Sequence, residues 1–248
     1  MTALALEVPL RREDALHFLG YRGQGAPAAR TESALDAALA EARDLVAPRG
    51  VHRIVPRECA AVLELPVQSG PCIALGLVTI GPALERRVSE LLARGEDTRA
   101  LLLDAAGSAA AEEAADELER RIHVAAGSCA PGEGAAGPGA AGPAAASRRK
   151  PRRVSPGYGA WPLTAQRALF DLMPHDEIGV RLLTSCLMVP RKTVSFAVWL
   201  DERVGAATEE GAASESSADS AARPGRCASC DSTTCPYREE TPARGESS

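Results

Sequence analysis

One twelve-residue stretch of this chain, residues 152–163, combines proline, glycine, aromatic residues and arginine in the sequence RRVSPGYGAWPL. The stretch holds two prolines, two glycines and two of the few aromatic residues of the chain. Proline fixes φ, whereas glycine permits positive φ and lets other groups approach the backbone closely. The stretch therefore predicts a tight turn that leads into a helix. Such a turn can also place backbone amides, a phenol and a guanidinium around one small anionic molecule.

Apolar residues recur at helical spacing on both sides of this turn. The expected helices are residues 9–20, 31–46, 82–94, 97–124 and 164–173. The fourth is one long helix or two shorter ones, with Gly107 as its weak point. Short apolar runs bounded by proline, glycine or polar residues predict strands. The expected strands are residues 51–56, 60–65, 72–79, part of 179–189, and 193–200. These elements predict an α+β fold, with a mixed or antiparallel sheet flanked by helices.

Composition divides the chain into four parts. Residues 1–126 are the N-terminal α+β part, and residues 153–204, which carry the turn, are expected to complete the same domain. Between them, residues 127–152 combine a Gly/Ala/Pro-rich run with a basic cluster, which predicts a flexible linker. Residues 205–248 begin with an Ala/Ser/Glu-rich run and predict a disordered tail.

The overall composition excludes several classes of protein. Hydrophobic residues make up 45% of the 248 residues but aromatic residues only 3%, so Ala, Leu and Val must build the core. A net charge of −5 argues against a general nucleic-acid binder, which needs a basic face. No apolar run is long enough to span a membrane, and the first residues lack the basic region of a secretory signal. We therefore expect a cytoplasmic protein with no nucleic-acid or membrane partner.

The chain has seven cysteines, and an odd number without a secretory signal indicates reduced thiols. Three of them form a Cys-x2-Cys-x4-Cys cluster in the tail: Cys227, Cys230 and Cys235. Three thiolates at this spacing can hold Zn²⁺ or part of an iron–sulfur cluster, and free thiols are the alternative. One candidate function is therefore a small metal- or iron–sulfur-binding redox protein. By contrast, Cys59, Cys72 and Cys186 lie in apolar, strand-like contexts and are expected to be buried.

Three segments of the chain resemble the AdoMet-binding reactivation (activation) domain of cobalamin-dependent methionine synthase. Residues 153–158 (RVSPGY) resemble the Arg-x-Ser/Ala-Pro-Gly-Tyr motif of that family. Residues 178–182 and 184–190 are similar to its Gly-x-x-Leu-Thr-x-Ser-x-x-Met-x-Pro segment, and Val194-Ser195 follows in place. The chain is too short for a whole methionine synthase, so it resembles a stand-alone form of this module.

The resemblance implies a fold, a ligand and a partner. The fold would be the helmet-like α+β reactivation domain, and the ligand would be S-adenosylmethionine. The function would be reductive remethylation of cob(II)alamin on a methionine synthase, or another corrinoid protein, that lacks its own reactivation domain. A flavodoxin-like protein would supply the electron. The alternatives are the redox protein described above and a degenerate scaffold that binds nothing.

The resemblance also implies the residues that contact the ligand: Arg153, Ser155, Gly157, Tyr158, Glu112 and Asp14. A guanidinium matches a carboxylate bidentately, which suits Arg153 to the ligand carboxylate. Glu112 would accept hydrogen bonds from the amino group or the ribose hydroxyls of the ligand. Glu113, the next residue, is the alternative at this position. The chain departs from the family at Phe196, where a glycine is expected. The family's later tyrosine near the ligand has no counterpart between Val198 and the tail.

Overall fold

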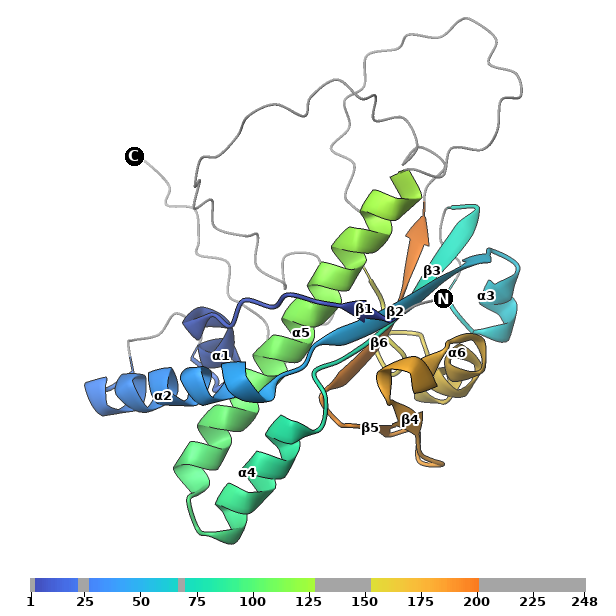
Figure 1. Cartoon of the computed structure of the whole chain (residues 1–248). Coiled ribbons are helices and arrows are strands. Elements are labelled where there is room, and N and C mark those ends of the chain that lie inside the picture. The colour runs from blue at the N-terminus through green and yellow to red at the C-terminus, as the bar shows by residue number, and fades with distance from the viewer. Residues whose placement is uncertain (1–2, 22–26, 67–69, 128–152, 201–248) are drawn as a thin grey trace, which may run out of the picture.

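The computed structural model describes residues 3–21, 27–66, 70–127 and 153–200, arranged around a four-stranded antiparallel sheet (Figure 1). Its strands, in spatial order, are β1 (Leu4–Ala5), β2 (Arg49–Pro56), β3 (Cys72–Thr79) and β6 (Thr193–Leu200). β3 pairs along its whole length with β2 on one side and with β6 on the other. The sheet therefore joins the N-terminal part of the chain to the segment that follows residue 153.

Side chains alternate between the two faces of this sheet, as strand geometry requires. On β3, Ile73, Leu75 and Leu77 belong to one core cluster, whereas Ala74 and Val78 belong to another on the opposite face. All five side chains are fully buried. A strand buried on both faces is a continuous apolar run, and this explains why residues 72–79 are recognisable as a strand in the sequence.

The helix α5 (Asp97–Gly127) crosses one face of the sheet and is drawn in green in Figure 1. Its second half packs Ala114, Leu118 and Ile122 into the same core cluster as Phe196 of β6. The sequence left open whether this segment is one helix or two, and the structure shows one.

Gly107 lies within α5 and does not interrupt it. Its lack of a side chain makes room for a neighbouring helix. A Cβ at Gly107 would lie 2.6 Å from a terminal carbon of Leu84, which belongs to α4 (Ala83–Ala93). Glycine therefore lets the two helices approach closely at this point.

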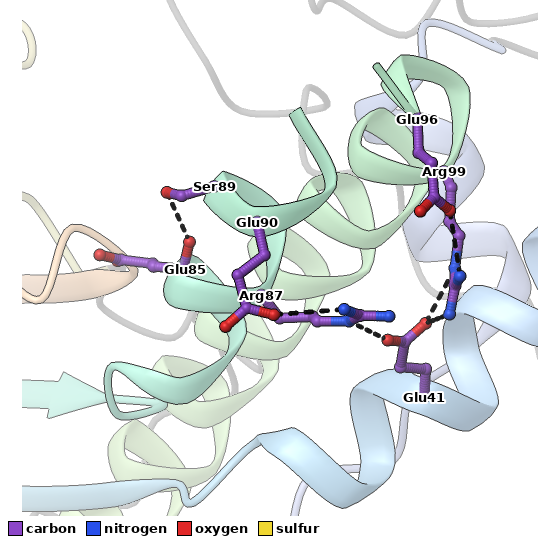
Figure 2. A network of polar contacts seen from close by, with 7 residues as sticks. All are labelled: Glu41, Glu85, Arg87, Ser89, Glu90, Glu96 and Arg99. Carbon is purple, nitrogen blue, oxygen red and sulfur yellow. Dashed lines mark hydrogen bonds and ion pairs between the residues drawn. The ribbon is translucent and has the colours of Figure 1, made fainter. Parts of the chain in front are cut away.

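Three helices pack against the first half of α5 and share its core cluster: α1 (Arg12–Phe18), α2 (Ala29–Leu45) and α4. Polar contacts tie this group together on its outer side (Figure 2). Glu41 of α2 accepts hydrogen bonds from Arg87 of α4 at 2.6 Å and from Arg99 of α5 at 2.8 Å.

Short elements cover the other face of the sheet: α3 (Cys59–Val62), η1 (Leu163–Ala165), α6 (Gln166–Leu172), η2 (His175–Ile178), β4 (Arg181–Leu182) and β5 (Met188–Val189). β4 and β5 pair as a separate two-stranded antiparallel hairpin. Trp161, Leu169 and Phe170 from this segment pack with Leu75 and Trp199 of the sheet. The observed architecture confirms the predicted α+β class and the antiparallel form of the sheet.

The strand expected at residues 60–65 is wrong. Residues 59–62 form α3, and the Leu63 amide donates to the Cys59 carbonyl at 3.0 Å. Ala60 and Leu63 are both buried, and a three-residue spacing of buried residues belongs to a helix rather than to an alternating strand. Glu64 then takes a positive φ of 50°, which ends the helix.

The expectation for three cysteines is confirmed only in part. Cys186 is buried, but it lies in the turn between β4 and β5 rather than in a strand. Cys59 and Cys72 are half-buried, and of the three only Cys72 lies in a strand.

Part of what the sequence predicts lies outside the described residues. This applies to the linker from residue 128 to 152 and to the tail with its cysteine cluster. Within the described ranges, no helix is both long and apolar enough to cross a membrane.

Candidate functional site

A short bridge between backbone groups holds Arg153 at the edge of the sheet. The Val154 amide donates to the Ala197 carbonyl of β6 at 2.9 Å, and the Ala197 amide donates to the Val154 carbonyl at 2.8 Å. The Val154 side chain packs on the face covered by α6. Because neighbouring side chains in extended backbone point to opposite faces, Arg153 points to the face covered by α5.

Three carboxylates on α5 surround the Arg153 guanidinium. Its Nη2 lies 2.6 Å from Glu112 Oε2, and its Nη1 contacts Asp116 and lies 3.2 Å from Glu119 Oε2. Residues four and three positions apart on a helix share one face, so the three acids form one row along α5. We call these four residues the Arg153 cluster.

The Arg153 cluster is mostly shielded from solvent. The Arg153 side chain is 16% exposed, and its guanidinium lies over the ring of Phe196, 5.9 Å from the ring centre. Burial acts to lower the pKa of Arg153, but attraction to Asp116 and Glu112 outweighs it and raises that pKa above its ordinary value. Arg153 therefore carries its positive charge at any physiological pH.

The turn that follows Arg153 is anchored at its far end. The Gly157 amide donates to the Trp161 carbonyl at 2.8 Å, and Gly157 takes a φ of +90°, which favours glycine. The Trp161 side chain is 1% exposed, and its Nε1 donates to the Leu63 carbonyl at 2.7 Å. These contacts leave Tyr158 at the tip of the turn with 76% of its surface exposed.

The positions singled out from the sequence do not all come together. Arg153 and Glu112 form an ion pair, and Glu113, the alternative to Glu112, is buried at 4% exposure. Ser155 is half-buried within the turn, where its carbonyl accepts a hydrogen bond from the Tyr158 amide at 3.1 Å.

Asp14 lies apart from the other positions, on α1. That helix packs near Ala106 and Ala110 of α5, before the Arg153 cluster in the sequence. Among the described residues, no hydrogen bond or ion pair links Asp14 to the Arg153 cluster, and its buried Oδ2 has no hydrogen-bond partner there.

Sequence reasoning did not assign Asp116, Glu119 or Trp161 to the site. The spacing of Glu112, Asp116 and Glu119 was the available signal for the two acids. A row of acids on a helix is also typical of a solvated face, so the signal points to a site only once Arg153 is known to lie opposite.

A pocket of about 370 Å³ lies elsewhere, around α3. Its lining residues are Arg57, Glu58, Ala60, Ala61, Glu64, Leu65 and Trp199. Trp199 and Phe196 belong to core clusters on opposite faces of the sheet, so the sheet separates this pocket from the Arg153 cluster.

The described part of the chain shows no candidate metal site. In that part, no group of three or more His, Cys, Asp or Glu side chains is arranged to hold a metal ion. The predicted ligands Cys227, Cys230 and Cys235 lie outside it.

Comparison with known proteins identifies one family. A family profile described as "Vitamin B12 dependent methionine synthase, activation domain" matches residues 62–204, more than half of the chain. Among solved structures, the chain is similar to the "Crystal Structure of the MetH Reactivation Domain bound to AdoHcy". The TM-score is 0.48 and the identity is 14%, over 80% of this chain and 78% of the other. A comparison with curated proteins finds no match.

Proposed function

The chain belongs to the family of the vitamin B12-dependent methionine synthase activation domain, and we propose that it binds S-adenosylmethionine and supports reductive remethylation of cob(II)alamin in trans. The partner is a methionine synthase, or another corrinoid protein, without an activation domain of its own. The electron comes from a flavodoxin-like reductant.

The pairing of Arg153 with Glu112 is the observation that supports this proposal most strongly. These two positions were assigned to the ligand by resemblance alone, although 41 residues separate them in the sequence. The amino-acid end of S-adenosylmethionine is a zwitterion. Its carboxylate suits the guanidinium of Arg153, and its ammonium suits the carboxylate of Glu112.

The turn supplies the remaining contacts in this proposal. Gly157 has no side chain and lets a ligand approach the backbone, and the exposed ring of Tyr158 is free to cover the adenosine or the sulfonium. Ser155, which lies between Arg153 and Gly157 in the sequence, offers backbone atoms to the ligand. Because Trp161 anchors the turn in the core, these groups are held in place before the ligand binds.

The ligand and the corrinoid supply the chemistry, and the protein supplies proximity and orientation. When bound, S-adenosylmethionine would supply the methyl group, the partner's corrinoid would accept it, and the reductant would supply the electron. Arg153 and Glu112 would hold the amino-acid end of the ligand, and the turn around Gly157 and Tyr158 would hold its adenosine end. The alternative of a metal-binding redox protein rests only on the spacing of Cys227, Cys230 and Cys235.

Calorimetric titration with S-adenosylmethionine tests the proposal. Replacing Arg153 with alanine removes a charge-assisted bidentate contact, and binding is expected to weaken by about tenfold to a hundredfold. The matched control is Arg120→Ala, which removes an exposed arginine that pairs with Glu117 on α5. The control is expected to bind like the unmodified protein.

Two results would contradict the proposal. Equal affinity in the unmodified protein and Arg153→Ala would remove Arg153 from the site. Absence of binding to the unmodified protein would show that S-adenosylmethionine is not the ligand.

The trans activity is measured as methylcobalamin formation on a methionine synthase truncated before its activation domain, with reductant and S-adenosylmethionine present.

A further inference from the structure

The environment of Arg153 assigns a role to three residues beyond the ligand contacts. We propose that Asp116, Glu119 and Phe196 are positioning residues that fix the Arg153 guanidinium as a receptor for the ligand carboxylate. This inference rests on the proposed binding of S-adenosylmethionine. It explains why the chain surrounds one arginine with three acids and an aromatic ring.

The Arg153 guanidinium has more hydrogen-bond donors than the three carboxylates use. A guanidinium has five N–H groups. Within the described residues, Nη1 is directed to Asp116 and Glu119, and Nη2 is directed to Glu112. One N–H on Nη2 and the N–H on Nε remain. These two donors are the pair that a side-on bidentate contact with a carboxylate needs.

The Arg153 guanidinium also contacts an aromatic ring. Its central carbon lies over the Phe196 ring, 5.9 Å from the ring centre, within the range of a cation–π contact. The ring itself is immobilised, because Phe196 is fully buried and packs over Gly76 of β3. A glycine at position 196 would remove this contact. The aromatic residue that departs from the family pattern therefore supports Arg153 from the sheet.

The acids that hold Arg153 lie on a rigid element. Asp116 and Glu119 lie on α5, whose Leu118 is fully buried against the sheet. Acids on a packed helix hold their partner more firmly than acids on a loop. The two acids hold Nη1 of the guanidinium, and the Phe196 ring contacts its central carbon. The remaining two N–H groups consequently point in one direction.

A pair of ligands separates positioning of Arg153 from general stability of the site. S-adenosylmethionine and its decarboxylated form share the adenosine, the sulfonium and the amine, and only the first has a carboxylate. Residues that act through Arg153 affect the first ligand alone. A merely structural role affects both ligands equally. The measured quantity is the ratio of the two dissociation constants, obtained by titration calorimetry.

The variants are Asp116→Asn, Glu119→Gln and Phe196→Leu in the 248-residue chain. Each is expected to weaken binding of S-adenosylmethionine by about threefold to tenfold, the effect of one ordinary hydrogen bond, and to leave the decarboxylated ligand within about twofold. The matched control is Glu117→Gln, because Glu117 lies on α5 but pairs with Arg120 and Arg121. It is expected to leave the ratio unchanged.

A double variant adds a second readout. In an Arg153→Ala background, Glu119→Gln is expected to have no further effect on either ligand, because positioning requires the arginine. Circular dichroism checks the fold of each variant, and Glu119→Gln keeps the test decisive if Phe196→Leu fails to fold.

Failure of this inference differs from failure of the proposed function. If Glu119→Gln weakens both ligands equally, or neither, the positioning role is wrong while S-adenosylmethionine binding stands. If the unmodified protein binds neither ligand, the proposed function is wrong and the inference falls with it.

Discussion

Gly76 and Phe196 are paired across β3 and β6, and only a glycine leaves room for the aromatic ring. A Cβ at Gly76 would lie 2.3 Å from the tip of that ring. Gly76→Ala is therefore expected to destabilise the protein by about 1–3 kcal/mol, the usual cost of overpacking a core. Urea denaturation measures this loss. The double variant Gly76→Ala/Phe196→Leu is expected to lose less than the two single variants together, and additive losses would contradict the steric explanation.

Resemblance named Arg153 and Glu112 separately as ligand residues, but it predicted neither their ion pair nor what else holds Arg153. The spacing of Asp116 and Glu119 fits a solvated helix face equally well, because their partner lies more than 30 residues away. Phe196 was recognised only as a departure from the family. Its ring is explained by Gly76, a residue of another strand. The ion pair and the ring packing depend on tertiary contacts that no local pattern contains.

Glu41 connects α2 with α4 and α5, and this connection makes the stability of the helical group dependent on pH (Figure 2). Burial acts to raise the pKa of Glu41, but hydrogen bonds from Arg87 and Arg99 outweigh it and lower that pKa below its ordinary value of 4.5. The unfolded chain therefore takes up the proton first as pH falls. The stabilisation is present above pH 4.5 and is lost as pH falls through the lowered pKa.

Glu41→Gln tests this connection. The variant is expected to be less stable than the unmodified protein at neutral pH, and the difference should shrink toward zero well below pH 4.5. Thermal unfolding at a series of pH values measures it. The control is Glu7→Gln, an exposed residue outside the helices that forms no ion pair with other described residues. A difference that stays constant with pH would contradict the assignment.

Prediction of the elements succeeded where the pattern extends over many residues. The strand at 72–79 and the helix beginning at residue 97 have the predicted limits or continue beyond them. Residues 60–65 were misassigned because a short apolar run fits a strand and a helical turn equally well. In the folded chain Trp161 donates to the Leu63 carbonyl from almost a hundred residues away, and a local pattern does not contain such a contact.

The two parts of the chain on either side of residues 128–152 share a single sheet. All eight residues of β6 are paired with β3, from Thr193 opposite Thr79 to Leu200 opposite Cys72. On one face β6 packs against α5, and on the other it packs against the segment around α6. We propose that residues 153–204 and the N-terminal part form one domain, because neither part can bury β3 without the other.

A single domain of this kind should unfold in one step, and the chain offers separate probes for its two parts. The two tryptophans, Trp161 and Trp199, are both 1% exposed and both lie after residue 153, so their fluorescence reports on that part. Far-UV circular dichroism reports mainly on α2 and α5, with 17 and 31 helical residues. The two urea unfolding curves are expected to coincide in midpoint and slope.

Loss of the tryptophan signal at a lower urea concentration than the helical signal would show that residues 153–200 unfold on their own. In that case the N-terminal part does not need β6 to remain folded, and the single-domain proposal is wrong.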